Sequence, residues 1–202
     1  MSTGILALWN DCEPAHRASY ESWYAEEHLP ERLGLPGFLR GRRYLALDGA
    51  PQFFTYYEVA TPEVLIDPVY LKRVNNPTPR TKFIMGEAFR NMSRTICQVT
   101  AREGRMRGAW AVTRTLTFDV TAPDLAELIQ TPGVARAEQW VEADLSAPAE
   151  NAETRLRGGD VTVAGCLFVE TLRREDAEDL AAEIPGARVW QFLCELEAEP
   201  GG

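Results

Sequence analysis

The sequence predicts an α+β fold in which the element order β-α-β-β-α-β occurs twice along the chain. Apolar runs typical of strands alternate with stretches of helical spacing in this order in both halves. This order is the ferredoxin-like motif, whose helices cover one face of the sheet and leave the other to be buried by a partner. Two tandem units in one chain can bury these faces against each other, so we predict that they pack sheet to sheet.

Short similarities between the halves support an internal repeat. Residues 96–99 (ICQV) close the first half, and residues 193–196 (LCEL) close the second. In each half a Pro-Gly pair, at 36–37 and at 132–133, directly precedes a predicted strand. These matches favour a duplication with its boundary in the polar segment 102–108.

The net charge of −9 is unevenly shared by the two predicted units, residues 1–104 and 105–202. The first unit has 12 Lys/Arg and 12 Asp/Glu, whereas the second has 9 Lys/Arg and 18 Asp/Glu. An acidic surface argues against nucleic acid as a partner, because nucleic acid selects basic surfaces. A solvated acidic face is a sufficient explanation of the charge.

The first unit is expected to contain four strands and two helical regions. The strands are predicted at 4–10, 38–47, 52–60 and 92–101, and the helical regions at 15–33 and 62–86. The second region should be broken at Pro68 and near Pro79. Strand 52–60 is apolar or aromatic on both faces, so we expect its sheet to be covered on both sides.

The second unit repeats this order. Its strands are predicted at 110–118, 135–145, 161–172 and 187–197, and its helices at 122–130 and 174–184. Pro123 suits the first turn of the first of these helices. Residues 146–159 are rich in Ala, Pro, Asn and Gly, and we expect a loop there.

The composition is ordinary for a globular protein, with 45% hydrophobic and 25% charged residues. No apolar run approaches the roughly 18 residues that a membrane helix needs, and the N-terminus lacks the pattern of a signal peptide. We therefore expect a cytoplasmic protein without a membrane partner. Its four cysteines lie far apart without a CxxC pair, so we expect reduced thiols and no metal site.

Residues 23–44 carry the main chemical signal. Tyr20, Trp23, Tyr24 and His28 fall on one face of the predicted helix. His28 is one of only two histidines and is therefore the leading candidate for acid–base catalysis near neutral pH. Burial lowers the pKa of such a ring and a neighbouring glutamate raises it, so we expect a pKa near neutrality. The alternative is a core or capping histidine stabilised by the helix dipole.

The pattern Trp23-Tyr24-x-x-Glu27-His28-x-Pro30, followed by Leu35-Pro36-Gly37-Phe38 and Arg42-Arg43-Tyr44, resembles the dimeric α/β-barrel superfamily. It looks most like the EthD-like branch. The resemblance implies that the two units form an α/β barrel within one chain. Members of this superfamily include haem-degrading and cofactor-free monooxygenases, lactone isomerases and cyclases, so the fold does not select an activity.

The resemblance also assigns unequal roles to the two halves. The lactone isomerases of the superfamily use a histidine at the place that matches His28. The second half lacks the motif, because Leu128-Ile129-Gln130 stands roughly where it would be. We therefore expect the second half to serve as a built-in partner for the first.

Tyrosines of the two strands after His28 are the next candidates. Tyr44 and Tyr57 are predicted to act with His28 by stabilising a developing oxyanion, and Tyr56 to bind substrate. Alternation puts Tyr56 and Tyr57 on opposite faces of strand 52–60, and the sequence does not show which face looks at His28. The alternative is an ordinary aromatic core with hydrogen-bonded hydroxyls.

The remaining candidates are substrate-binding residues. Trp9, Trp23 and Tyr24 are predicted to wall an apolar pocket. Arg42, or its neighbours Arg40 and Arg43, could bind a carboxylate or phenolate. Alternation puts Arg40 and Arg42 on one face of the strand and Arg43 on the other. The alternatives are core aromatic residues and an exposed arginine on a strand. Helical region 62–86 has no histidine, whereas haem-binding members of the superfamily often use one there, so we expect no cofactor and rank haem lower.

Together these features predict a small cofactor-independent enzyme that acts by proton transfer, as an isomerase, cyclase or lyase. Its substrate would be an aromatic or lactone-like small organic molecule. A cofactor-free monooxygenase on a phenolic substrate and a non-catalytic ligand-binding or accessory protein are the alternatives. Both a monomer with an internal barrel and a homodimer fit the sequence.

Overall fold

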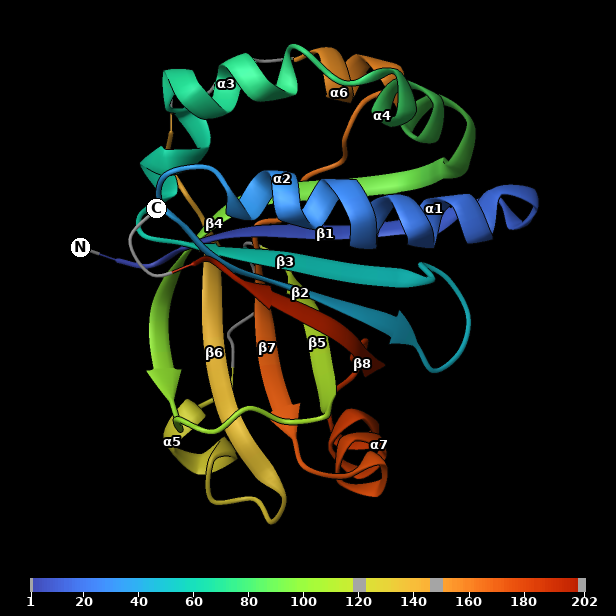
Figure 1. Cartoon of the computed structure of the whole chain (residues 1–202). Helices are drawn as coiled ribbons and strands as arrows, with labels where there is room; N and C mark the ends of the chain where they lie inside the picture. Colours follow the sequence, from blue (N-terminus) through green and yellow to red (C-terminus); the bar gives the residue numbers. More distant parts are fainter. Residues whose placement is uncertain (1, 118–122, 146–150, 200–202) are drawn as a thin grey trace.

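The computed structural model describes residues 2–117, 123–145 and 151–199. Within these ranges eight strands close into one antiparallel barrel in the order β1-β3-β2-β8-β5-β7-β6-β4 (Figure 1). The strands are β1 (Gly4–Cys12), β2 (Phe38–Ala46), β3 (Phe53–Val59), β4 (Phe89–Glu103), β5 (Trp110–Leu116), β6 (Val134–Glu142), β7 (Gly165–Thr171) and β8 (Arg188–Glu197). The predicted α+β fold and the sheet-to-sheet packing are confirmed.

Each half contributes one four-stranded sheet to this barrel. The orders β4-β1-β3-β2 and β6-β7-β5-β8 are those of the ferredoxin-like motif. The edges of the two sheets pair with each other: in the β2–β8 pair Arg43 lies opposite Cys194, and in the β4–β6 pair Gln98 lies opposite Val141. Because both joins are hydrogen-bonded, the barrel has no free sheet edge.

Helices cover the outer faces of both sheets (Figure 1). The α-helices are α1 (Arg17–Trp23), α2 (Leu29–Leu33), α3 (Pro68–Val74), α4 (Pro79–Phe83), α5 (Leu125–Leu128), α6 (Ala152–Leu156) and α7 (Arg174–Glu183). Short 3-10 helices span η1 (Pro14–His16) and η3 (Pro62–Ile66), and π-helical turns span η2 (Tyr24–His28) and η4 (Ile84–Ala88). Helices α1 to α4 lie over the first sheet, and α5 and α7 over the second.

Three apolar clusters result from this arrangement. The barrel interior is filled by aromatic rings, with Trp140 stacked on Phe168 at 4.7 Å between ring centroids. A second cluster lies between the first sheet and its helices, and a third between the second sheet and α7. All seven residues of β3 are buried, which confirms that its sheet is covered on both sides.

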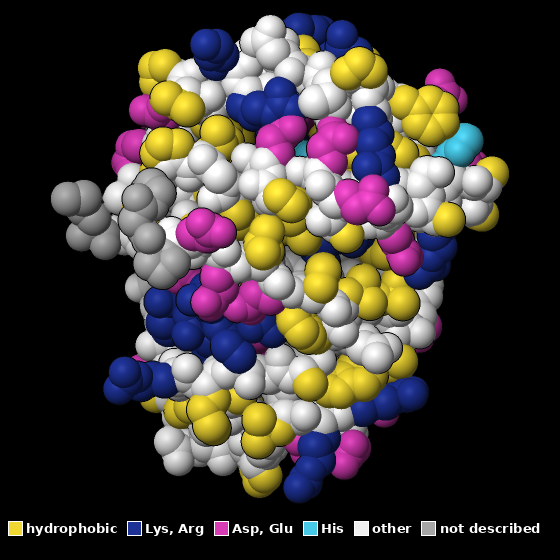
Figure 2. Space-filling model, viewed as in Figure 1, with side chains coloured by type: hydrophobic (Ala, Val, Ile, Leu, Met, Phe, Trp, Pro, Cys, Tyr) yellow, Lys and Arg dark blue, Asp and Glu magenta, His cyan; other side chains and the backbone are white. Residues whose placement is uncertain are grey.

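A network of ion pairs fills one end of the barrel. Glu170 is fully buried on β7 and contacts Arg42 and Arg107 at 3.1 Å each. The network continues through Glu58 to Arg102 at 3.2 Å, so it links strands of both halves to the segment that connects them. Figure 2 shows basic and acidic side chains gathered together on the visible face of the molecule.

The structure differs from the expected elements mainly in the second half. The predicted loop 146–159 contains helix α6. Asn151 caps the first turn of this helix, because its side chain accepts a hydrogen bond from the Thr154 amide. Helix α5 is shorter than predicted and is capped by Asp124. Residue 118 of the predicted strand, residue 122 of the predicted helix and residues 146–150 of the predicted loop lie outside the described ranges.

Candidate functional site

The helix that carries His28 changes its winding just before this residue. It is α-helical to Trp23, π-helical from Tyr24 to His28 and α-helical again from Leu29. The Leu29 amide donates to the Tyr24 carbonyl, five residues back, and a π turn of this kind is frequent at functional sites. As a result both Tyr24 and His28 point inward and are buried.

Aromatic rings hold the His28 imidazole in place. It stacks on Trp23 with 4.1 Å between ring centroids and meets the edges of Tyr24 and Tyr57 at 5.2 and 6.4 Å. The Trp23 indole is itself anchored, because its N–H donates to the Thr81 hydroxyl at 3.1 Å. The imidazole therefore has one well-defined orientation against the sheet.

His28 is neutral in this structure at pH 7. Burial, followed by the positive charges of Arg32 and Arg157, holds the pKa of the imidazole well below its usual value of 6.5. The expectation of a pKa near neutrality is therefore wrong. Glu27, the nearest glutamate in sequence, accepts hydrogen bonds from threonines 78 and 81, so its carboxylate is engaged away from the imidazole.

Several buried polar atoms near His28 have no hydrogen-bond partner among the described residues. They are His28 Nδ1, the Tyr57 hydroxyl and two guanidinium nitrogens of Arg43. Arg43 packs over the Tyr24 ring at 3.7 Å. These atoms can therefore form hydrogen bonds with a molecule bound beside His28.

A small cavity of about 20 Å³ lies beside His28. Its polar lining consists of His28, Tyr24, Tyr57, Tyr70, Arg32, Arg94, Glu153 and Arg157. The cavity has room for about one water molecule. Its wall therefore brings a neutral imidazole, tyrosine hydroxyls and three guanidinium groups close together.

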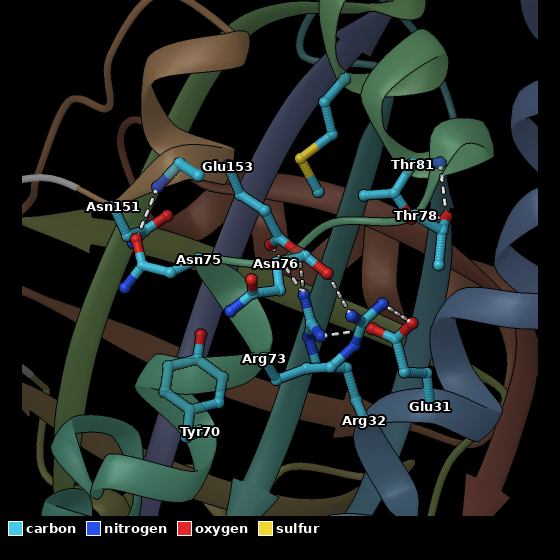
Figure 3. A network of polar contacts seen from close by, with 12 residues as sticks. Glu31, Arg32, Tyr70, Arg73, Asn75, Asn76, Thr78, Thr81, Asn151 and Glu153 are labelled. Atoms are coloured by element: carbon cyan, nitrogen blue, oxygen red, sulfur yellow. Dashed lines mark hydrogen bonds and ion pairs between the residues drawn. The ribbon is translucent and has the colours of Figure 1, made fainter.

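Figure 3 shows a polar network that includes Arg32 and Glu153 of this cavity wall. The Arg32 guanidinium on α2 lies 2.6 and 2.7 Å from the two carboxylate oxygens of Glu153 on α6. Its other terminal nitrogen contacts Glu31 at 2.6 Å, and Glu31 also pairs with Arg73 on α3. The network thus ties α2, α3 and α6 together.

A much larger pocket adjoins the small cavity. Its volume is about 820 Å³, and it opens at the barrel end opposite the ion-pair network, next to Trp9 on β1 and Thr113 on β5. Met92 and Arg157 line both spaces, so the two spaces adjoin at these side chains. A pocket of this size can hold a small organic molecule.

The structure brings together only part of the predicted site. Four of the predicted residues lie on the helix-covered face of the first sheet: His28, Trp23, Tyr24 and Tyr57. The other four face the barrel interior or its ends: Trp9, Tyr44, Tyr56 and Arg42. The predicted alternation along β3 is confirmed, and Tyr57 is the tyrosine that looks at His28.

Tyr44 and Arg42 cannot act together with His28 in this structure. The Tyr44 hydroxyl donates to Glu170 at 3.2 Å, and Arg42 pairs with Glu170 and with Glu195. Alternation along β2 turns both side chains away from the helices. The neighbouring Arg43 takes the place on the His28 side.

Four further residues of the site were not predicted: Arg32, Arg94, Glu153 and Arg157. Arg32 could have been found, since it follows His28 by four residues and so shares its helix face. Glu153 and Arg157 come from a segment with no repeating pattern, and nothing local in the sequence connects them to His28.

Other kinds of site find no support in the described part of the chain. No group of three or more His, Cys, Asp or Glu side chains is placed there to hold a metal ion. All four cysteines are free, and burial raises the pKa of Cys12 to about 11 and that of Cys97 to about 12. None of the described helices combines the length and the apolar character needed to span a membrane.

Comparison with solved structures defines the fold. An anthrone oxidase-like protein matches with 12% identity and a TM-score of 0.64, covering 98% of this chain and 94% of that one. A candidate monooxygenase of Fusobacterium nucleatum subsp. nucleatum matches with 11% identity and a TM-score of 0.55 over 98% and 95%. A candidate chlorite dismutase matches with 9% identity and a TM-score of 0.57 over 96% and 96%.

These matches are too distant in sequence to establish an activity. A scan against models of protein families finds no match, and a search of curated proteins finds none. What the solved structures share with this chain is the architecture over nearly its whole length. The chain therefore has the dimeric α/β-barrel fold, with both halves of the barrel supplied by one polypeptide.

Proposed function

We propose that this protein is a small cofactor-independent enzyme that acts by proton transfer on an aromatic or lactone-like molecule. The observation that carries the proposal is the neutral, buried His28 imidazole in the wall of a cavity, whose Nδ1 has no hydrogen-bond partner among the described residues. A neutral imidazole is the form that can accept a proton. The Trp23-Tyr24-x-x-Glu27-His28-x-Pro30 pattern also supports a place in the EthD-like branch.

In the proposed reaction His28 takes a proton from a C–H or O–H group of the substrate. The substrate becomes an anion, and Arg32, Arg94 and Arg157 in the cavity wall stabilise its negative charge. Burial raises the pKa of Tyr57 well above its usual value, so its hydroxyl stays protonated. This hydroxyl can then donate a hydrogen bond to the substrate oxygen that gains charge.

The same arginines have two opposing effects on the proton transfer. They lower the pKa of His28, which disfavours the imidazolium, and they stabilise the substrate anion. An anion placed between the imidazole and the guanidinium groups offsets the first effect. Return of the proton to another carbon gives an isomerisation, and loss of a leaving group gives a lyase reaction.

A cofactor-free monooxygenase is the second candidate, and the similarity to an anthrone oxidase-like protein favours it. Deprotonated anthrone can react with O2 directly. The methylene carbon loses two hydrogens, one oxygen atom becomes the new carbonyl oxygen, and the other leaves as water. The first step is the same proton transfer to His28, so both candidates make the same demand on the site.

Access of a substrate requires a local rearrangement, because the cavity beside His28 holds about one water molecule. The pocket of about 820 Å³ is a suitable entrance, because it adjoins the cavity. Met92 and Arg157 are the two residues that line both spaces. We propose that the substrate first occupies this pocket and reaches His28 when the two side chains move aside.

Turnover by the wild type, His28→Gln and His16→Gln proteins tests the proposal. The substrates would be anthrone, with and without air, and a set of unsaturated lactones. We expect turnover of at least one substrate that falls by about 10²-fold or more in His28→Gln, the lower range for a general base, and is unchanged in His16→Gln. Oxygen dependence would favour the monooxygenase. Equal rates in both variants would contradict a role for His28, and ligand binding without turnover would favour the binding protein.

A further inference from the structure

Helix α6 belongs to the second half of the chain but closes the site of the first half (Figure 1). The Ala152 amide donates to the Asn75 side chain at 3.0 Å, which places α6 beside α3. Glu153, 4% exposed, extends from α6 toward α2, and its carboxylate binds Arg32 (Figure 3). A carboxylate that comes from 121 residues away in sequence therefore forms part of the cavity wall next to His28.

The surroundings of α6 leave it room to move. A helix of five residues has little stability of its own, so its position depends on its contacts. It is followed by Gly158 and Gly159, which have φ values of 84° and 101° and no atoms within 4 Å of where a side chain would begin. A groove of about 500 Å³, lined by Asn76, Lys82 and Leu156 among others, lies directly beside it.

The cavity wall carries more positive than negative charge. Asp160 binds Arg157 through both carboxylate oxygens at 2.7 Å, and Glu153 binds Arg32. Arg94 donates to the Tyr70 hydroxyl at 3.1 Å, and the described residues offer it no carboxylate partner. Arg32 is the most deeply buried of these guanidinium groups, 2% exposed, and a buried charge without a counter-ion is costly. The position beside Arg32 is therefore suited to a carboxylate.

We propose that Glu153 occupies the position of a ligand carboxylate, and that the substrates of this site are aromatic carboxylates held by Arg32. The inference rests on the proposed function, because it names the substrate class for the site of His28. The ligand carboxylate replaces that of Glu153 on Arg32, and α6 shifts toward the groove. The aromatic rings of the ligand then lie against His28 and the Trp23 ring behind it.

Binding of 2-naphthoate tests this, with 2-naphthamide as the uncharged analogue of the same shape. Affinities would be measured by calorimetry for the wild type, Glu153→Gln, and Glu178→Gln as a control in an exposed ion pair. The double variant Arg32→Gln/Glu153→Gln removes both charges of the buried pair, so it leaves no buried charge that would impair folding.

We expect Glu153→Gln to bind 2-naphthoate at least about tenfold more tightly than the wild type, a change of about 1.4 kcal/mol. The affinity for 2-naphthamide and the behaviour of Glu178→Gln should not change. The double variant should lose most of the preference for the acid over the amide that Glu153→Gln shows. Equal affinity of wild type and Glu153→Gln for 2-naphthoate would overturn the inference, as would equal affinity of the acid and the amide in Glu153→Gln.

The binding assay separates this inference from the proposed function. Turnover that depends on His28 without an effect of Glu153→Gln on 2-naphthoate binding would refute the inference alone. Tighter 2-naphthoate binding by Glu153→Gln without turnover of any substrate would support the carboxylate site and refute the enzyme.

Discussion

The neutral state of His28 has a consequence for stability that can be measured without a substrate. In the unfolded chain the imidazole has its usual pKa near 6.5, whereas in the folded protein the pKa is lowered by burial and by nearby arginines. Below pH 6.5 the unfolded state therefore binds a proton that the folded state does not bind. The stabilisation is fully present above pH 6.5 and is lost as the pH falls toward the native pKa.

The size of this effect follows from the linkage between proton binding and folding. The free energy of unfolding should fall by about 1.4 kcal/mol for each pH unit between 6.5 and the native pKa of His28. In a chain of this size a loss of about 1.4 kcal/mol lowers the melting temperature by about 3 to 6 °C.

The assay is urea unfolding between pH 5 and 7.5 of the wild type, His28→Gln and His16→Gln. Carboxylates also titrate in the lower part of this range, so the informative quantity is the difference between wild type and variant at each pH. We expect the wild type to lose its advantage over His28→Gln as the pH falls and His16→Gln to follow the wild type. A difference between wild type and His28→Gln that does not depend on pH would refute the buried, neutral state of His28.

Three other predictions concern the site, the barrel and the assembly. Tyr57→Phe should lower kcat by about 10²-fold, as loss of an oxyanion donor does. Tyr56→Phe, on the opposite face of β3, should keep the kcat of the wild type, and equal effects of the two substitutions would contradict the assigned face. In urea titrations Phe168→Ala should lower the free energy of unfolding by about 3 to 5 kcal/mol, because Phe168 is buried in the barrel. Phe83 is exposed, so Phe83→Ala should lower it by less than about 0.5 kcal/mol. Sedimentation should give the monomer mass of 22.6 kDa because the barrel is closed, and a stable dimer would contradict this.

Much of the fold could be predicted because its signals are local. Apolar alternation and Pro-Gly turns located the strands, and the apolar or aromatic character of both faces of 52–60 indicated a sheet covered on both sides. The opposite directions of Arg42 and Arg43 also followed from alternation. The sequence could not show whether Arg42 or Arg43 points toward the helices. That depends on how the two sheets close into the barrel, and no local pattern contains this information.

The site was harder to predict because it is assembled from distant segments. His28, Trp23 and Tyr24 lie on one helix face and could be grouped from the sequence. The π turn at 24–28 could not be predicted, since it depends on which carbonyl the Leu29 amide selects. Glu153 reaches the site only through tertiary contacts with α2 and α3, so an apparent loop in the second half completes the site of the first half.

The most direct test of the account is exchange of the substrate proton with solvent. Anthrone would be incubated without O2 in deuterated buffer with the wild type, His28→Gln or His16→Gln, and deuterium at its methylene carbon followed by NMR. We expect exchange above the rate in buffer for the wild type and His16→Gln, and exchange at the buffer rate for His28→Gln. Enhanced exchange that persists in His28→Gln would contradict the assignment of His28 as the base.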